Sequence, residues 1–388
     1  MGHSIASCVS SIGFSAIRRM MIMAQEYDDV VTLGIGEPDM DTPEHVIRAA
    51  MDDALAGWTH YAHSQGDPEL RQALSESLRA NGRDVGPERI QITHGAMGAL
   101  MAAMRTLLCD GGEVLTPEPH FPDYAAHVGF AGGRLATVRS RFEDGFIVRP
   151  EKLEAAVTGN TRMLLLNSPC NPTGAVLPAE VLDAVAEMAV RRDLFVVSDE
   201  VYDAMSFDGP APSIFDRPGM AERCLVVNSF SKTYAMTGWR VGYCYGPDWL
   251  MRELIKVVSY STASASTPGQ RAGLAALRGP KEPFAAMVDE FSRRSHYVHD
   301  RLAAMPGLRV NRPQGSFYMF ADVSGSGMDG RTFAEALLRE EQVVVIPGET
   351  FGPSCGNFVR IACTVPMDRL EIAMDRMERF MKRHGEMA

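Results

Sequence analysis

Lys232 has the most distinctive chemical surroundings of any residue in this 388-residue chain. It follows a strand-like run, Cys224–Asn228, together with Ser229 and Ser231, and Arg240 comes eight residues later. Hydroxyl groups and an arginine suit a phosphate, because charge-assisted and bidentate hydrogen bonds are strong. A lysine beside them can form a Schiff base with an aldehyde. An aldehyde that carries its own phosphate is pyridoxal 5′-phosphate (PLP), although this run alone fits a solvated lysine on a surface loop equally well.

Other polar residues stand at the ends of further strand-like runs. Asn171 lies in the segment after one run, Asp199 and Tyr202 follow another, and Gly95-Ala96-Met97 follows a third and opens a helix-like stretch. Ligands of open α/β sheets bind beyond the carboxyl ends of the strands. Together with Lys232, these placements predict one site at one edge of one sheet.

The chemistry of PLP assigns a role to each of these residues. Its ring nitrogen needs a carboxylate to stay protonated, and Asp199 is the candidate, although an aspartate here could simply cap the next helix. Asn171 and Tyr202 could donate to the phenolate oxygen. The phosphate suits a helix N-terminus, which the run Gly95-Ala96-Met97 provides. Phe121, in a proline-rich loop, could stack on the ring or simply contribute to packing.

Short apolar runs alternate with helix-like stretches, which is typical of an α/β domain with a mostly parallel sheet. The helix-like stretches include Ala96–Cys109 and Ala179–Arg192, and Pro178 before the second is a helix-opening signal. We expect a large domain with a mostly parallel seven-stranded sheet flanked by helices. The seven expected strands are Arg89–Thr93, Glu113–Thr116, Arg134–Val138, Arg162–Leu166, Leu194–Ser198, Leu225–Asn228 and Arg240–Tyr245.

The pattern changes towards the C-terminus. Pro283–Met305 and Asp368–Arg383 have the spacing of amphipathic helices, and Gly315–Phe320 and Val343–Ile346 resemble strands. We expect a smaller α/β domain built from both chain ends. The predicted division is 1–45 as an N-terminal segment joining the small domain, 46–290 as the large PLP-binding domain, and 291–388 as the small C-terminal domain.

The composition excludes several classes of protein. Hydrophobic residues make up 46% and charged residues 22%, as in soluble globular enzymes. The formal net charge of −11 argues against a nucleic-acid partner, because a phosphate backbone needs a basic face. No apolar run approaches the ~18 residues of a membrane span, and no signal peptide is recognisable. Seven cysteines without a C-x-x-C pair suit reduced thiols, so we expect a cytoplasmic protein with no membrane partner and no metal.

A series of motifs runs from about residue 30 to residue 380. They are Leu33-Gly-Ile-Gly-Glu-Pro-Asp39, Tyr61 with Gly66-Asp-Pro-Glu-Leu-Arg71, Pro169-Cys-Asn-Pro-Thr-Gly174, Ser198-Asp-Glu-Val-Tyr202, Ser229-Phe-Ser-Lys-Thr-Tyr234, Gly238-Trp-Arg-Val-Gly242, Gly315-Ser-Phe-Tyr318, Pro347-Gly348 with Phe351-Gly352, and Val359-Arg360-Ile361. In this order and spacing the chain closely resembles the fold-type I PLP-dependent aminotransferases, class I/II, of the aspartate aminotransferase superfamily. The resemblance implies transfer of an α-amino group from an amino acid to a 2-oxo acid, with 2-oxoglutarate as the expected acceptor.

The resemblance implies further roles for individual residues. Lys232 would carry the cofactor as a Schiff base and, once released, shuttle a proton at the substrate's α-carbon. Arg360 would clamp the substrate's α-carboxylate, helped by Asn171 and by the backbone of Gly36. Ser229, Ser231 and Arg240 would hold the cofactor's phosphate. Tyr61 would reach the phosphate of a neighbouring subunit, which predicts a homodimer with sites shared across the interface.

One position departs from a well-known subgroup of this family. Aspartate-specific prokaryotic members carry a lysine at the position of Met97, where it binds the side-chain carboxylate of the substrate. Met97 cannot do this, so we expect a neutral, apolar or aromatic amino acid rather than an acidic one as the substrate. An aspartate-specific enzyme remains an alternative, if an arginine from the partner subunit supplies the missing cation.

Three other functions share sequence features with transamination. Gly34-Ile-Gly36 mimics the start of a dinucleotide-binding loop, but Asp39 occupies the place of the third glycine and Pro38 would block the helix. A non-catalytic regulator on this fold would carry an added DNA-binding domain, whereas about 30 residues precede the first motif. A PLP-dependent C–S lyase on the same scaffold stays open, because lyases keep the lysine, the aspartate and the carboxylate-binding arginine.

Overall fold

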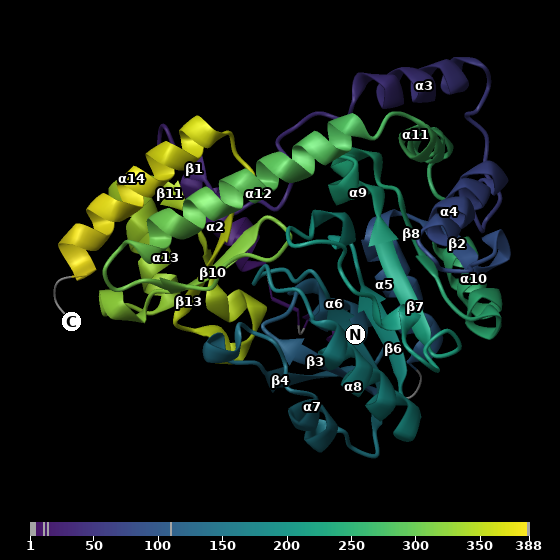
Figure 1. The fold of residues 1–388 in the computed structure, drawn as a ribbon, viewed down its shortest axis with the longest axis horizontal. Coiled ribbons are helices and arrows are strands. Elements are labelled where there is room, and N and C mark those ends of the chain that lie inside the picture. The colour runs from purple at the N-terminus through teal and green to yellow at the C-terminus, as the bar shows by residue number, and fades with distance from the viewer. Residues whose placement is uncertain (1–4, 11, 14, 109–110, 386–388) are drawn as a thin grey trace, which may run out of the picture.

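The computed structural model describes residues 5–10, 12–13, 15–108 and 111–385 (Figure 1). Its largest sheet has seven strands in the order β2-β8-β7-β6-β5-β3-β4. Strand β8 runs antiparallel to both of its neighbours, and every other neighbouring pair is parallel. The expected mostly parallel seven-stranded sheet is therefore confirmed. The strands are β2 Ile90–Thr93, β3 Glu113–Glu118, β4 Arg134–Arg139, β5 Thr161–Asn167, β6 Phe195–Asp199, β7 Cys224–Ser229 and β8 Gly242–Tyr245.

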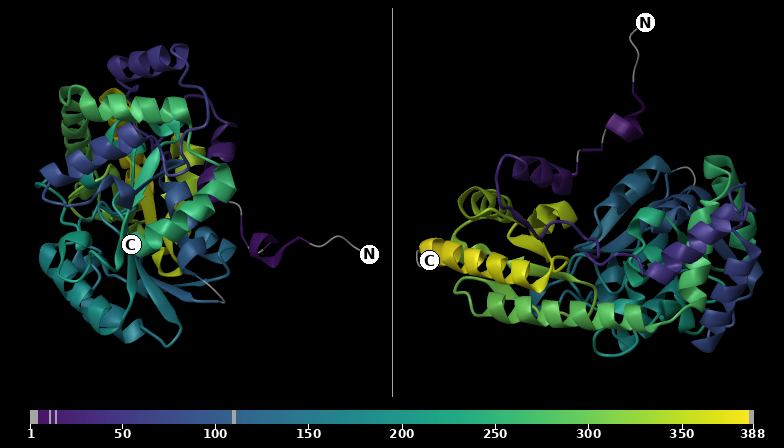
Figure 2. Two further views of the ribbon diagram at one scale, coloured as in Figure 1. Left: turned by 90° about the vertical axis from the view of Figure 1, so that its right-hand side faces the viewer. Right: turned by 90° about the horizontal axis from the view of Figure 1, so that it is seen from above.

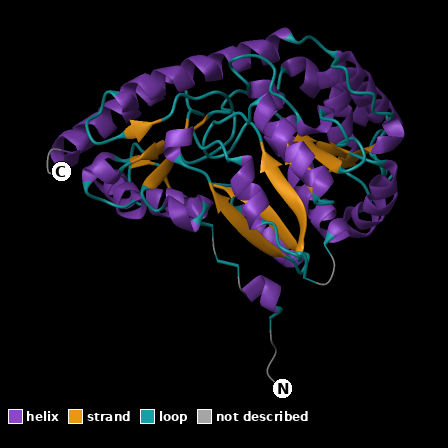
Figure 3. Ribbon diagram, turned by 60° about the horizontal axis from the view of Figure 1, so that its bottom comes forward, coloured by secondary structure: helices purple, strands orange, loops and turns teal. Residues whose placement is uncertain are grey.

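Helices cover both faces of this sheet, and the strands lie between them in Figure 3. Successive residues of a strand point to opposite faces. In β6, for example, Val196 joins one hydrophobic cluster and Val197 joins the other. Both faces of the central strands β5, β6 and β7 are buried, so these strands contain continuous apolar runs rather than alternating ones. One face carries α3 Glu44–Leu55, α4 Pro68–Ala80, α7 Pro150–Ala156, α8 Ala179–Arg191 and α11 Thr267–Arg278, and the other carries α5 Gly95–Leu107, α6 Asp123–Phe130 and α10 Asp248–Thr262.

A second group of elements is built from both ends of the chain. A four-stranded antiparallel sheet has the order β12-β13-β10-β9, and β1 pairs with β11 in parallel. Helix α2 packs into the same hydrophobic cluster as α13 and α14, and Figure 2 shows it, in purple, beside the C-terminal elements. These elements are α2 Ala16–Ala24, β1 Val31–Thr32, β9 Arg309–Val310, β10 Tyr318–Asp322, α13 Gly330–Glu341, β11 Val343–Val344, β12 Ile346–Pro347, β13 Phe358–Ala362 and α14 Met367–His384. The short helix α1 Ser7–Ser10 instead contacts α6 of the large domain.

Helix α12, Glu282–Ala303, links the two groups of elements (Figure 1). Its Phe284 packs into the core beneath the large sheet, whereas Val298 and Leu302 pack into the core of the smaller group. The pairing of β1 with β11 supports the assignment of the N-terminal segment to the small domain. The boundaries 1–45, 46–290 and 291–388 stay a prediction, and the last of them falls inside this continuous helix.

Several element boundaries differ from those expected. The strand predicted from Arg240 begins at Gly242, because Arg240 has a left-handed backbone (φ 55°) after a 3-10 turn. The run predicted as one strand, Val343–Ile346, is divided between β11 and β12, and β10 begins at Tyr318 rather than Gly315. Helix α5 ends at Leu107, and the predicted end at Cys109 lies outside the described residues. No helix in the described ranges is long and apolar enough to span a bilayer.

Candidate active site

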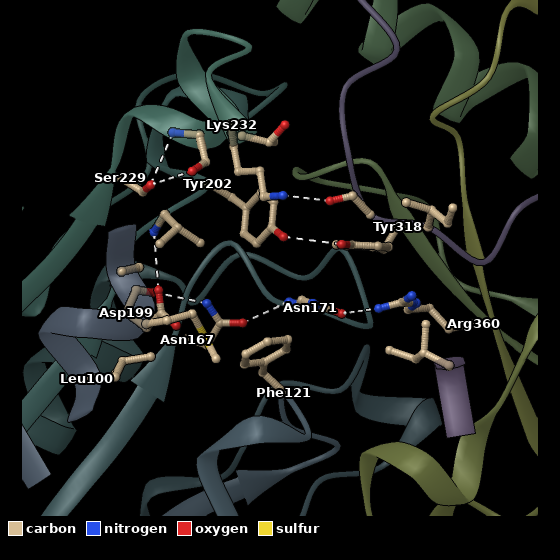
Figure 4. A pocket seen from close by; sticks show the side chains of 18 of the residues that line it. Leu100, Phe121, Asn167, Asn171, Asp199, Tyr202, Ser229, Lys232, Tyr318 and Arg360 are labelled. Atoms are coloured by element: carbon tan, nitrogen blue, oxygen red, sulfur yellow. Dashed lines mark hydrogen bonds between the residues drawn. The ribbon is translucent and has the colours of Figure 1, made fainter. Parts of the chain in front are cut away.

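A cavity of ≈ 320 Å³ lies at the carboxyl edge of the large sheet (Figure 4). Strands β5, β6 and β7 are parallel neighbours. Asp199 is the last residue of β6, and the segments after β5 and β7 supply Asn171 and Lys232. The small sheet supplies Tyr318 and Arg360 from the opposite side. The predicted site residues that line the cavity are Gly36, Ala96, Met97, Phe121, Asn171, Asp199, Tyr202, Ser229, Ser231, Lys232, Arg240 and Arg360.

Lys232 reaches this cavity from a short helix, α9 Phe230–Thr233, directly after β7. The side chain of Ser229 caps the helix by accepting a hydrogen bond from the backbone N–H of Ser231. Lys232 Nζ donates to the carbonyl oxygen of Gly36 at 2.6 Å. Burial lowers the Lys232 pKa to about 8; the carboxylate of Glu37 opposes this shift, and the cations of Arg240 and Arg360 add to it. The neutral amine that attacks a carbonyl is therefore accessible near neutral pH.

An anion-binding group lies beside Lys232. Ser229 Oγ donates to Ser231 Oγ at 2.9 Å, and Arg240 Nη1 donates to the carbonyl oxygen of Thr237 at 2.8 Å. A Cβ added to Gly95 would lie 2.7 Å from Arg240 Nη2, so glycine lets the guanidinium approach the N-terminus of α5. No carboxylate pairs with Arg240 among the described residues. Two hydroxyls, a guanidinium and a helix N-terminus suit a phosphate.

Asp199 ends β6 and is buried beneath the cavity. Its Oδ2 accepts a 2.6 Å hydrogen bond from Tyr124 Oη. Burial raises the Asp199 pKa to about 6, and the bonds from Tyr124 and the backbone of Val201 oppose the rise. The alternative interpretation, a cap for the next helix, gains no support, because a short 3-10 turn, Asp203–Met205, follows instead of an α-helix. A buried carboxylate of this kind is stabilised by a cation that faces it.

Two phenol groups and an amide lie between Asp199 and Arg360 (Figure 4). Tyr202 Oη is 3.2 Å from Tyr318 Oη. The backbone N–H of Asn171 donates to the side-chain oxygen of Asn167 at 2.8 Å, which orients the segment after β5. Phe121 forms one wall of the cavity. The side-chain oxygen of Asn171 accepts from Arg360, and its side-chain nitrogen has no partner within the described residues, so it can donate to a ligand.

Arg360 is a buried cation without a carboxylate partner in the described part of the chain. It is 2% exposed, and its guanidinium donates to Asn171 Oδ1 at 3.1 Å and to the carbonyl oxygen of Gly34 at 2.7 Å. Its Nε has no hydrogen-bond partner among the residues that the structure describes. The rings of Tyr318 and Phe351 lie 4.5 and 5.0 Å from the guanidinium carbon. A buried charge with unused donors is costly, so this site is suited to an anion from outside the chain.

Two of the predicted residues do not line the cavity. Gly95 is not exposed to the cavity, but it lies next to the guanidinium of Arg240, which is. Tyr61 is 90% exposed and lines a separate surface pocket with Trp58 and His63. The expected contact of Tyr61 with a neighbouring subunit stays a prediction. No group of three or more His, Cys, Asp or Glu side chains within the described ranges is placed to hold a metal ion.

The donor set fits a phosphorylated pyridine aldehyde. Lys232 can bond covalently to the aldehyde, the hydroxyls and Arg240 suit the phosphate, and buried Asp199 suits a ring cation. The family model "Aminotransferase class I and II" matches residues 28–377. The chain belongs to this family.

Relatives and solved structures agree with this assignment. The chain is 40% identical to "Aromatic-amino-acid aminotransferase 2" of Thermococcus litoralis, over 95% of this chain and 96% of the relative. It is also 40% identical to "Aspartate aminotransferase" of Pyrococcus abyssi, with the same coverage. The structure of Thermus thermophilus aspartate aminotransferase with maleate superposes with a TM-score of 0.92 at 37% identity, covering 97% of this chain and all of that one. This aminotransferase is a PLP-dependent transaminase of amino acids.

The sequence did not identify every residue of this aminotransferase's cavity. Tyr124 donates a hydrogen bond to Asp199. It lies three residues after Phe121, and nothing in the local sequence indicates its contact with Asp199. Tyr318 stood in a quoted motif but received no role. Ile17 comes from α2 and Ile35 from the loop after β1. Tyr318, Ile17 and Ile35 reach the cavity from distant segments, whereas Tyr124 contacts Asp199 without lining the cavity itself. Only the fold could have identified these contacts.

Proposed function

We propose that Lys232 holds PLP as a Schiff base and moves the proton during transamination. When bound, PLP withdraws electrons from the substrate's α-carbon, which makes the α-proton acidic. Lys232 Nζ, once free, accepts that proton and returns it to the adjoining carbon of the cofactor. The lowered Lys232 pKa supports this role, because a base must be neutral to accept a proton.

The cofactor is held in this proposal by residues at or after the ends of β2, β3, β5, β6 and β7, together with Arg240 before β8. Asp199 keeps the ring nitrogen protonated, and Tyr202 and Asn171 donate to the phenolic oxygen. Ser229, Ser231, Arg240 and the N–H groups of Gly95, Ala96 and Met97 hold the phosphate, while Phe121 stacks on the ring. The positions of these side chains around one cavity support the assignment.

The substrate's α-carboxylate binds Arg360, and the proposed function rests mainly on this one site. The guanidinium is buried, lacks a carboxylate partner among the described residues and faces the same cavity as Lys232. The planar guanidinium group can donate two parallel hydrogen bonds to one carboxylate. Asn171 and the backbone of Gly36 complete the site. Every good substrate should then carry an α-carboxylate, and simple amines should fail.

The substrate's side chain is neutral, apolar or aromatic in this proposal. Ile17, Ile35 and Met97 line the cavity, and no cation stands at Met97 to pair with a second carboxylate. The relatives leave both possibilities open, because one named for aromatic amino acids and one named for aspartate are equally similar. The amino group passes to a 2-oxo acid, with 2-oxoglutarate as the expected acceptor.

Half-reactions with single amino acids test this proposal. The purified enzyme is mixed with leucine, methionine, phenylalanine or aspartate, and conversion to the pyridoxamine form is followed by absorbance. We expect aspartate to show no advantage in kcat/KM, and Met97→Lys to shift the preference towards aspartate. A clear preference of the unmodified enzyme for aspartate would contradict the neutral-substrate proposal. Release of a thiol and a keto acid from cysteine conjugates, without the pyridoxamine form, would indicate a C–S lyase instead.

A homodimer is the proposed active unit. Ile47, Met51 and Leu55 recur every four residues on α3 and are exposed, with Leu55 at 88%. Tyr61, which follows this helix, is 90% exposed, and Tyr260 of α10 is 93% exposed. An exposed apolar helix face and exposed aromatic rings favour burial against a second copy. Tyr61 of each subunit would then reach the phosphate site of the other.

The cellular setting follows from the same proposal. We expect the enzyme in the cytoplasm, in amino-acid metabolism, because its substrates and PLP are found there and its seven cysteines suit a reducing compartment. Fractionation of the source cells, with transaminase activity measured in each fraction, tests this expectation. Activity in a secreted fraction would contradict it.

A further inference from the structure

Tyr318 connects the two halves of the cavity, and no role has been assigned to it so far. It begins β10 in the small sheet and is buried, with 2% exposure. Its ring lies 4.5 Å from the guanidinium carbon of Arg360, and its hydroxyl lies 3.2 Å from that of Tyr202 (Figure 4). One side chain therefore touches both the proposed carboxylate site and a proposed cofactor ligand.

The hydroxyl of Tyr318 is held in a fixed position. A Cβ added to Gly36 would lie only 1.6 Å from Tyr318 Oη, so glycine is required to make room for this hydroxyl. The carbonyl oxygen of the same Gly36 accepts the hydrogen bond from Lys232. The ring also packs between Phe317 and Tyr202, with centroid distances of 4.8 and 5.8 Å. These contacts restrict the rotation of the Tyr318 side chain, so its hydroxyl stays directed towards Tyr202.

The count of protons fixes the direction of the bond between the two phenols. Each phenol has one proton to donate and lone pairs that accept. Within the described residues, each hydroxyl has the other as its hydrogen-bond partner. The proposed function requires that the hydroxyl of Tyr202 donates its hydrogen bond to the phenolic oxygen of the cofactor. The oxygen of Tyr202 can then only accept a hydrogen bond from Tyr318. Tyr318 is then the donor.

We propose that Tyr318 is a positioning residue, whose hydroxyl donates to Tyr202 and directs the proton of Tyr202 towards the cofactor's phenolic oxygen. A phenol that accepts a hydrogen bond becomes a better donor, because hydrogen bonds in a chain polarise one another. Stronger donation offsets the negative charge on the phenolic oxygen. The neighbouring Schiff-base nitrogen of Lys232 then loses its proton more readily, so Tyr318 lowers the pH at which the resting enzyme changes colour. This inference rests on the proposed roles of Lys232 and Tyr202.

A spectral titration of the holoenzyme tests the inference without relying on activity. In Tyr318→Phe the ring stays over Arg360 and only the hydroxyl is lost. We expect the midpoint of the colour change to rise by roughly half a pH unit. A shift of this size corresponds to part of the free energy of one hydrogen bond. Tyr297→Phe is the matched control, since Tyr297 accepts from Arg301 on α12 and does not line the cavity. Its midpoint should equal that of the unmodified enzyme.

A double-mutant cycle separates action through Tyr202 from a direct effect. Tyr202→Phe should raise the midpoint, and adding Tyr318→Phe to it should cause no further rise. An unchanged midpoint in Tyr318→Phe, or an equal rise in both backgrounds, would overturn the role of Tyr318 and leave that of Tyr202 intact. An unchanged midpoint in Tyr202→Phe would instead overturn the proposed role of Tyr202, and with it the inference.

Discussion

Among the described residues that line the cavity, Lys232, Arg240 and Arg360 are cationic and Asp199 alone carries a carboxylate. This excess of positive charge suits a ligand set with a phosphate and a carboxylate, both of which are anions. The single carboxylate lies at the buried end of β6, where burial raises its pKa and Tyr124 holds its orientation. At the scale of residues, each charge thus has a distinct proposed task.

Asp199→Asn tests the task assigned to the carboxylate. The amide keeps the shape and can still accept from Tyr124, but it cannot stabilise a protonated ring nitrogen. We expect PLP to stay bound and turnover to fall by roughly three orders of magnitude. Asp203→Asn is the control, because Asp203 is a half-buried carboxylate that accepts from Asn228 and does not line the cavity. Near-normal turnover of the Asp199 variant would mean that this carboxylate is only structural.

The pH dependence of cofactor uptake tests the chemistry of Lys232. In the cofactor-free enzyme its pKa is lowered to about 8, and only the neutral amine attacks the aldehyde. Uptake of PLP should therefore slow about tenfold for each pH unit below 8 and level off above it. Stopped-flow absorbance measures the rate. A rate that still rises steeply up to pH 10 would show that the lysine has its ordinary basicity.

At the scale of elements, the N-terminus of α5 and the start of α9 meet at the phosphate site. Gly95 has φ 64° and a side chain there would collide with Arg240, whereas Gly98, one turn later, has room for a Cβ. Gly95→Ala should weaken PLP binding at least tenfold, because the strained backbone and the displaced guanidinium both disturb the site. Titration of the cofactor-free enzyme with PLP measures the change.

Gly98→Ala is the matched control for that prediction. It makes the same chemical change in the same helix, but its nearest neighbour would be His94 Cβ at 3.4 Å, an ordinary contact. PLP affinity should be unchanged, and the free energy of unfolding should stay equal or rise by up to about 1 kcal/mol. Equal affinities of the two variants would show that the N-terminus of α5 does not contribute to the phosphate site.

The sequence predicted these elements well where local patterns determine them. The apolar runs became the strands of the large sheet, and the motifs after β5, β6 and β7 met at one edge as expected. The prediction that β8 begins at Arg240 was wrong. A single residue with a left-handed backbone does not change the pattern of apolar residues, so the sequence could not indicate it. Tyr318 and Ile17 were missed as cavity residues, since their positions depend on how the small sheet and α2 pack against the large domain.

At the scale of the whole molecule, the proposed homodimer makes each site depend on two chains. Lys232→Ala and Tyr61→Ala should each be nearly inactive alone. A hybrid dimer contains one intact site, because the subunit with Lys232 receives Tyr61 from its partner. Dissociating and mixing the two variants in equal amounts should restore roughly a quarter of the full activity, as random pairing requires. No recovery after proven exchange of subunits would contradict shared sites.

The most direct test of the central claim is to identify the lysine that holds PLP. The chain has five lysines, and Lys152, Lys256, Lys281 and Lys382 do not line the cavity. Reduction of the yellow enzyme with borohydride fixes the Schiff base permanently, and peptide mapping then locates it. We predict that the label is found on Lys232 and that Lys232→Ala carries none. Label on any other lysine, or the same labelling of the Lys232→Ala variant, would contradict the account.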